Sequence, residues 1–486
     1  MIDIRNVTSL VGLVMIFVAI MMIIPLTISL LLNDGAHWSL ILSIALTSLI
    51  GYLMFLMRIK GKDIGFREGF AVVTFGWLAM AVAGALPYYF NGYIPTFTDC
   101  FFESMSGFTT TGASILGSEL LIEGLPKGLL FWRSLTHWIG GMGIILMSLA
   151  ILPMLGIGGM QLFKAEVPGP TKDKLTPRIK DTAEILWLVY LGFTILQVIL
   201  LMFGGMDWFD SLCHTFGTMA TGGFSTRGES IAAYHSGYIE YVVILFMLIA
   251  GTNFTLHYRF ISKLDIKGYW SSREFRLYVA IIGIITLLLV TNNLTKDSIG
   301  EIEGVFRASL FQTVSILTTT GYGSADWEQW GAFAQLLLVC AMFIGGMAGS
   351  TGGGLKVIRL QLLLSQIRIE LRRLIHPQAI LPLRIGDQLI SDSIVGNVLA
   401  FLLAFALLLF TSTLFLSFLG IDMVTSFGAA IASLSNIGPG LGDVGATDNY
   451  GWMPGAAKWL LAMLMMLGRL EVFTVLVLFS RHYWIR

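Results

Sequence analysis

Long apolar runs constrain the fold of this 486-residue chain more than any other feature. A helix needs about 20 mainly apolar residues to cross a bilayer core that is about 30 Å thick. Only 12% of the residues are charged, and about 25% is typical of soluble domains. We therefore predict an all-α polytopic membrane protein. Its spans are expected near residues 9–32, 38–57, 69–90, 128–154, 183–204, 238–258, 275–292, 331–367 (interrupted), 392–419 and 455–480.

The basic residues between these segments are distributed unevenly. Most of the 30 Lys and Arg residues lie near the termini or in four connections, at 58–67, 164–180, 259–276 and 368–384. The positive-inside rule then predicts that both termini and these four connections are cytoplasmic, which requires an even number of spans. The first apolar segment is too long for the core of a cleaved signal peptide, so we expect it to be a span.

Four outward connections share an ungapped pattern. Each combines about a dozen moderately apolar residues, too few to span, with an end rich in Thr, Ser and Gly. The segments are Asp99–Ser114, Asp210–Ser225, Ala308–Gly323 and Thr425–Gly440. The aligned glycines are Gly112, Gly223, Gly321 and Gly438, and three residues before them lie Thr109, Ala220, Thr318 and Ser435. This internal repeat predicts four re-entrant half-helices, each followed by a loop.

Such loops have a definite use at membrane depth. Irregular backbone is tolerated there only where it is buried in protein or lines a watery cavity. Four converging loops would direct backbone carbonyls to one axis, where they replace the hydration shell of a cation. Glycine permits the conformations that turn successive carbonyls to the same side. One such loop would be explained as well by close helix packing through small residues, but the fourfold repetition favours a pore.

The sequence TTTGYG at Thr318–Gly323 resembles the filter signature of potassium channels. The whole chain resembles the Trk/Ktr/HKT superfamily of potassium transporters, and its length and first helices resemble the bacterial TrkH subfamily. This resemblance implies an extra transmembrane pair at 1–66 and pore repeats at 67–167, 168–270, 271–385 and 386–486. It also implies that potassium contacts backbone carbonyls in all four filters. The implied residues are Thr110, Thr111, Gly112, Thr221, Gly222, Gly223, Thr319, Thr320, Gly321, Asn436, Ile437 and Gly438.

A glycine-rich run, Gly345–Gly354, interrupts the eighth apolar segment. It cannot hold a stable helix, because each glycine costs close to 1 kcal/mol relative to alanine. Helix packing alone would not need so many glycines. The family has an intramembrane loop below its filter, so we expect such a loop here to act as a gate. The expected gate residues are Gly345, Gly346, Gly349, Gly352, Gly353, Gly354 and Arg469.

Two charged residues within apolar segments need an explanation. Aligning the inner spans on IGGM, AGTN, IGGM and LGRL places Arg469 at the depth of the glycine-rich loop. A guanidinium there would repel a cation and hydrogen-bond the loop carbonyls; the alternative is a structural ion pair with another helix. Glu103 lies within the first half-helix and is the best single candidate for a residue that contributes to an anionic vestibule.

Potassium uptake across the bacterial inner membrane is the function that these features favour. A secondary cation-coupled solute symporter also uses broken helices, but its repeats are few and often inverted. An enzyme would need an intramembrane nucleophile or metal cluster, and the three scattered cysteines and seven histidines form no such motif. The composition also excludes a nucleic-acid binder with a basic face.

The expected ligands and partners follow from the same analysis. Potassium in the filter is the only ion predicted, with no tightly bound cofactor. The resemblance implies a homodimer and a cytosolic nucleotide-binding regulatory subunit similar to TrkA. The basic loops suit such a subunit, and anionic membrane lipid suits them too. Whether uptake is channel-like or coupled to protons is open at this point.

Overall fold

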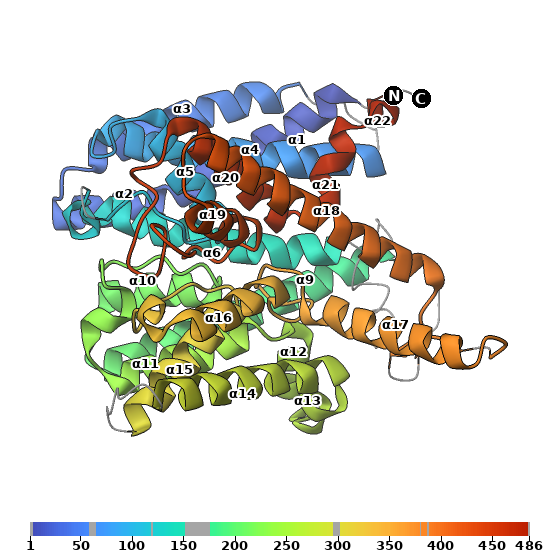
Figure 1. Ribbon diagram of the computed structural model, residues 1–486. Helices are drawn as coiled ribbons and strands as arrows, with labels where there is room; N and C mark the ends of the chain where they lie inside the picture. Colours follow the sequence, from blue (N-terminus) through green and yellow to red (C-terminus); the bar gives the residue numbers. More distant parts are fainter. Residues whose placement is uncertain are drawn as a thin grey trace.

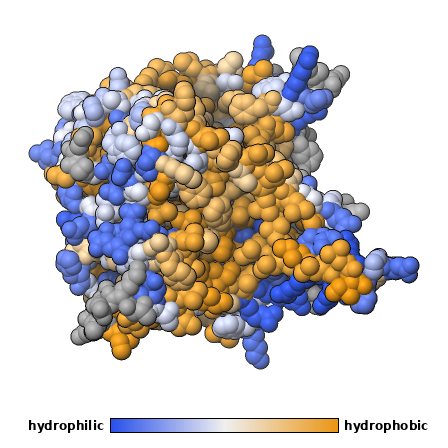
Figure 2. Space-filling model, in the orientation of Figure 1, coloured by the Kyte–Doolittle hydropathy of each residue, from blue (hydrophilic) through white to orange (hydrophobic). Residues whose placement is uncertain are grey.

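The computed structural model describes residues 3–57, 65–117, 120–150, 175–294, 302–379, 381–385 and 388–484. Within these ranges the elements are helices, apart from one short antiparallel pair of strands, β1 (Arg384–Ile385) and β2 (Gln388–Leu389). Long helices lie side by side (Figure 1). Figure 2 shows a broad apolar band between two hydrophilic margins. The prediction of a polytopic helical membrane protein is confirmed.

Most of the predicted spans are helices. Within the described residues, six helical stretches are long and apolar enough to cross a membrane: Ile4–Leu32, His37–Phe55, Arg67–Asn91, Thr182–Phe203, Arg273–Leu294 and Asp392–Phe418. These stretches belong to the helices α1 (Ile4–Met21), α2 (Ile23–Leu32), α3 (His37–Phe55), α4 (Phe66–Asn91), α9 (Leu175–Phe203), α14 (Arg273–Leu294) and α18 (Asp392–Phe418). A further helix, α6 (Lys127–Ala150), has 24 residues, a length of about 36 Å at 1.5 Å per residue.

Two predicted spans, 238–258 and 455–480, are not continuous helices. The first bends by 99° between α11 (Gly237–Ala250) and α12 (Phe254–Lys263), where the side chain of Asn253 caps the new helix. The second bends by 108° after α20 (Gly455–Arg469), before α21 (Phe473–Leu476) and η4 (Val477–Phe479). Glu471 and Val472 have positive φ at this bend, which ends the helix. Hydropathy missed both bends because it records composition along the chain and not the direction of the backbone.

The eighth predicted span is interrupted as expected. Helix α16 (Ala332–Ile344) ends before the glycine-rich run, and α17 (Val357–Ile375) begins after it. The remaining short elements are η1 (Ile122–Gly124), η2 (Ser230–Tyr234), α13 (Lys267–Ser271), η3 (Trp327–Trp330) and α22 (Arg481–Trp484).

The four repeated segments form short helices whose C-terminal halves are buried. They are α5 (Phe97–Phe108), α10 (Trp208–Met219), α15 (Ile302–Leu317) and α19 (Met423–Leu434). The side chains of Thr96, Asp207 and Asp422 cap the N-termini of α5, α10 and α19 by accepting backbone N–H groups. Each half-helix packs between the helices that precede and follow it, for example α5 between α4 and α6, and α19 between α18 and α20.

Both chain ends lie at the same end of the molecule, which α17 also reaches (Figure 1). The Tyr483 hydroxyl donates a hydrogen bond to the Arg67 carbonyl. The Tyr483 ring packs in a small cluster with Val7, Val11 and Ala71. The N-terminal helices and the end of the last repeat are therefore tied together, in agreement with an even number of membrane crossings.

Candidate ion pathway

Each half-helix ends in the same hydrogen-bonded turn. The residue after the helix cap has a left-handed conformation, with φ of 51° at Thr110, 53° at Thr221, 60° at Thr319 and 57° at Asn436. Its N–H bonds the carbonyl three residues back at 3.0–3.2 Å, and the next N–H bonds the carbonyl five residues back at 2.8–2.9 Å. This is a Schellman motif. A β-branched threonine is strained in this conformation, so the surrounding structure must impose it.

The backbone then alternates in handedness. The four aligned glycines have φ of 83° (Gly112), 81° (Gly223), 78° (Gly321) and 96° (Gly438). The residue between each pair of positive-φ positions does not have a positive φ. In an ordinary strand, successive groups point to opposite sides. Alternating handedness instead turns successive carbonyls to the same side, the arrangement by which a carbonyl ring can replace ion hydration.

The four loops close into a ring. A Cβ atom added to each aligned glycine would meet the carbonyl oxygen of the residue before the glycine of the next repeat. The pairs are Gly112 with Gly222, Gly223 with Thr320, Gly321 with Ile437, and Gly438 with Thr111. The last pair returns to the first repeat. A side chain at any of these positions would therefore displace the backbone of the neighbouring loop.

Side chains from one column of the repeat support the loops from behind. Nine residues before the aligned glycines lie Glu103, His214 and Gln312. Glu103 accepts hydrogen bonds from the Ser114 hydroxyl, His214 Nε2 bonds the Ser225 hydroxyl at 2.8 Å, and Gln312 donates to the Ala325 carbonyl at 3.0 Å. The fourth repeat has Ala429 in this column. There the Tyr450 hydroxyl donates to the Gly438 carbonyl at 2.7 Å.

Glu103 is buried behind the first of the four loops rather than exposed in a vestibule. Its carboxylate forms a fully buried ion pair with Arg133 of α6, with Nε and Oε1 2.5 Å apart. Arg133 also donates to the Ser225 carbonyl at 2.9 Å, and its guanidinium lies 3.5 Å from the centre of the Phe224 ring. The pair therefore joins the first half-helix to the filter segment of the second repeat. The sequence missed this because Arg133 is 30 residues away.

His137 strengthens the same junction. Its ring stacks on Phe224 with centroids 4.1 Å apart. Nε2 accepts the Phe224 N–H at 3.2 Å, so the neutral ring carries its proton on Nδ1, which donates to the Gly107 carbonyl at 2.7 Å. A Cβ on Gly222 would lie 2.6 Å from the His137 ring. A side chain at position 222 would therefore collide with the His137 imidazole, which is a reason for glycine at this position.

Acidic side chains do gather in the outer connections. Burial raises the pKa of Glu328, and the nearby carboxylates of Asp326, Asp448 and Asp443 raise it further. Burial and the neighbouring Asp443 likewise raise the pKa of Asp448. Burial is the larger cause of both shifts, and the carboxylates of Asp326, Asp443 and Asp448 add to it because they lie close to one another. This group, rather than Glu103, fits the anionic vestibule that the sequence predicts.

The glycine-rich run forms a closed loop below the ring. Its ends meet, because Leu355 N–H bonds the Phe343 carbonyl and Val357 N–H bonds the Gly346 carbonyl, at 3.2 and 3.0 Å. At its tip, the Gly353 N–H donates to the Thr319 hydroxyl at 2.7 Å. The Thr351 hydroxyl donates to the carbonyl of Met219, the last residue of α10, at 3.0 Å. The glycine-rich loop thus directly contacts the end of α10 and the turn that follows α15.

Two cationic side chains hold the loop tip. Arg469 donates to the Thr351 carbonyl at 2.7 Å and to the Gly140 carbonyl at 3.2 Å, and Lys356 donates to the Gly352 carbonyl at 2.6 Å. The ion pairs among the described residues do not include Arg469, and Glu471 instead pairs with Arg359 at 2.5 Å. Lys356 was missed at the sequence level, although it is an ionisable residue directly after an intramembrane run.

These features define a multi-pass membrane protein with four half-helices, a closed ring of irregular backbone and a loop beneath it. The TrkH family of cation transport proteins matches residues 38–484. The chain is 42% identical to the Trk system potassium uptake protein TrkH of Escherichia coli K12, over 99% of both chains. It is 40% identical to that of Halomonas elongata over the same shares. The chain belongs to the TrkH family.

A solved structure agrees with this assignment. The crystal structure of the potassium transporter TrkH from Vibrio parahaemolyticus superposes with a TM-score of 0.92 at 37% identity. The similarity covers 99% of this chain and all of that chain. Such coverage shows that the complete helical arrangement is shared.

We predict that Gly112→Ser reduces discrimination of K⁺ over Na⁺. The new side chain would displace the Gly222 carbonyl. Loss of a contact with a charged group costs about 1.5–3 kcal/mol, so the permeability ratio should fall by about tenfold or more. Reversal potentials under bi-ionic gradients measure this. Gly283→Ser is the matched control, since a Cβ there meets open space; equal ratios in both variants would contradict the ring assignment.

We also predict that the Glu103–Arg133 pair positions the filter. Breaking a buried pair from one side costs about 3–5 kcal/mol, so Glu103→Gln and Arg133→Gln should each destabilise the protein and lower the K⁺/Na⁺ ratio. The double variant should lose less than the sum. Thermal unfolding in detergent and flux ratios give the two readouts.

Arg227→Gln is the control, because the Arg227 side chain of its ion pair with Asp210 is 43% exposed. This substitution should lower the free energy of unfolding by at most about 1 kcal/mol. Additive losses with unchanged selectivity would show that the pair does not position the filter.

Proposed function

We propose that the protein mediates potassium uptake across the bacterial inner membrane, through a potassium-selective filter formed by the four loops. The names of its relatives support potassium as the substrate. The observation that carries the proposal is the closed ring, in which each aligned glycine faces a backbone carbonyl of the next repeat. A cation on the axis would meet carbonyls from all four repeats. A solute symporter is disfavoured, because four repeats of one orientation leave no inverted pair.

The side chains around the ring support coordination by backbone rather than by hydroxyl groups. The hydroxyls of Thr109 and Thr111 bond each other at 2.8 Å, as do those of Thr318 and Thr320. The Asn436 amide donates to the Thr111 hydroxyl at 2.9 Å and to the Met465 carbonyl at 2.8 Å. The buried Thr110 hydroxyl, which has no hydrogen-bond partner among the described residues, is an exception. Because the other hydroxyls and the amide are occupied, backbone carbonyls would supply most of the ligands, so Ile437 can take the place of Thr or Gly.

The loop Gly345–Gly354 and Arg469 are proposed as the gate in its closed position. The loop tip contacts the ends of the half-helices, whose negative dipole ends would otherwise face an ion below the filter. Arg469 and Lys356 place two cations beside it. A guanidinium is effectively always protonated, so it repels a potassium ion. Opening would require the loop to leave its bonds to Arg469, Lys356, Thr319 and Met219.

The orientation and assembly follow as further proposals. The basic connections support an orientation with both termini in the cytoplasm. The family resemblance suggests a homodimer and a cytosolic nucleotide-binding subunit that moves the loop. Helix α17 and the ends of the chain, which lie at one end of the molecule (Figure 1), would face that subunit.

We predict that Arg469→Ala raises basal potassium flux without changing the K⁺/Na⁺ ratio. The substitution removes both a positive charge and the bond to the Thr351 carbonyl. Shortening the loop within Gly349–Gly354 should act in the same direction. Flux into liposomes that contain only this protein measures both effects. Arg372→Ala, on the exposed face of α17, serves as the control; reduced or unchanged flux in both gate variants, with the proteins folded, would remove the gate assignment.

A further inference from the structure

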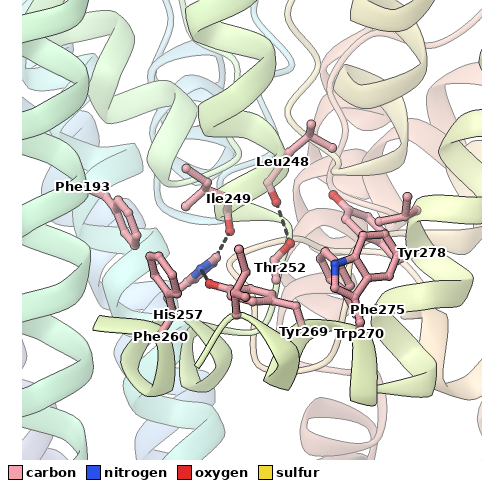
Figure 3. Close-up of a pocket in the computed structure, with 12 residues that line it drawn as sticks. Phe193, Leu248, Ile249, Thr252, His257, Phe260, Tyr269, Trp270, Phe275 and Tyr278 are labelled. Carbon is pink, nitrogen blue, oxygen red and sulfur yellow. Dashed lines mark hydrogen bonds between the residues drawn. The ribbon is translucent and has the colours of Figure 1, made fainter. Parts of the chain in front are cut away.

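An apolar cavity of about 410 Å³ lies behind the bend between α11 and α12, away from the ring of filter loops. Its floor is formed by α12 and α13, and its walls come from α9, α11 and α14 (Figure 3). The lining includes Phe193, Leu248, Ile249, Phe260, Trp270 and Val279. The volume falls in the usual range for small-ligand sites, of about 300–1,000 Å³.

The polar groups of this lining are largely satisfied within the protein. His257 donates from Nε2 to the Ile249 carbonyl at 2.9 Å and accepts at Nδ1 from the Tyr269 hydroxyl at 2.8 Å (Figure 3). The Thr252 hydroxyl donates to the Leu248 carbonyl at 2.8 Å. Among the described residues the buried Tyr278 hydroxyl has no hydrogen-bond partner. An occupant therefore meets a surface that suits hydrocarbon.

The cavity is connected to the gate loop through the bend at residues 250–254. The Met347 N–H bonds the Gly251 carbonyl at 2.9 Å, and the Thr351 N–H bonds the Ala250 carbonyl at 3.2 Å. The Phe254 N–H bonds the Gly349 carbonyl at 3.0 Å. The loop thus rests on the bend, whose position depends on where α12 lies. Tyr278 adds a direct link, since its hydroxyl is 2.7 Å from the position of a Cβ on Gly251.

The charges around the cavity indicate its occupant. Basic residues alternate with lining residues along α12, α13 and the start of α14: Arg259, Lys263, Lys267, Arg273 and Arg276. Of these five basic residues, only Arg259 takes part in an ion pair within the described part of the chain, with Asp265 at 3.7 Å. Helix α12 bends 99° away from α11, as an amphipathic helix in the membrane interface would. Such a cluster attracts anionic headgroups.

We propose that this cavity binds one acyl chain of an anionic phospholipid, with its phosphate at the basic cluster. The bound chain holds α12 in place and so steadies the glycine-rich loop in its pore-blocking position. The regulatory step rests on the proposed gate, whereas the binding step does not. The site differs from ordinary lipid contact because α12 both lines the cavity and, at its first residue Phe254, bonds the glycine-rich loop.

Binding is tested by native mass spectrometry of the detergent-purified protein titrated with phosphatidylglycerol, phosphatidylcholine or oleate. Val279→Trp fills the cavity from α14, and Leu287→Trp is the control on the same helix, on an exposed position outside the cavity lining. Each displaced methylene weakens affinity about fourfold. The affinity of Val279→Trp for phosphatidylglycerol should therefore be lower by at least about tenfold. Val279→Phe should have an intermediate affinity, and Leu287→Trp should bind as the wild-type protein does. Equal binding in all four proteins, or equal binding of phosphatidylcholine or oleate, would overturn the site.

Regulation is tested by basal potassium flux in liposomes. In the wild-type protein, adding phosphatidylglycerol to phosphatidylcholine membranes should lower basal flux severalfold. In Val279→Trp the flux should be low in both membranes, because the indole takes the place of the acyl chain. Lipid-independent flux in the wild type would overturn the regulatory step. The binding measurement involves no transport, so its outcome is independent of the proposed potassium uptake.

Discussion

The close approach of each aligned glycine to a backbone carbonyl of the next repeat is the constraint on which the rest of the structure depends. At each of these contacts backbone meets backbone, so there is no flexible side chain that could move aside if one of the four segments were displaced. The Schellman turn fixes the direction in which the chain leaves each half-helix. Side chains behind each loop, such as Glu103 and His214, then hold that loop at its distance from the centre of the ring.

These supports differ between repeats, because one chain supplies all four. Glu103 with Arg133, His214, Gln312 and Tyr450 solve the same positioning problem with different chemistry. The same freedom allows features that occur once. The closed glycine-rich loop belongs to the third repeat, and the arginine that bonds it belongs to the fourth. A symmetric tetramer of identical subunits would repeat both four times around the axis.

Much of the fold could be predicted from the sequence because the signals are local. Apolar length predicts spans, and the aligned Thr, Ser and Gly residues mark where the half-helices end. The depth alignment placed Arg469 at the level of the glycine-rich loop, and in the structure Arg469 donates hydrogen bonds to the Thr351 and Gly140 carbonyls. The repeat boundaries stay predictions. The bend at Val472 depends on backbone dihedrals that hydropathy does not record. The place of Glu103 depends on Arg133, a partner distant in sequence.

The most direct measurement of the central claim is anomalous diffraction from crystals of the protein grown in rubidium in place of potassium. The account predicts a peak on the axis between the carbonyls of Thr111, Gly222, Thr320 and Ile437, weakened in Gly112→Ser and kept in Gly283→Ser. A peak absent from the ring, or found only elsewhere in the chain, would contradict the assignment of these loops as the potassium filter.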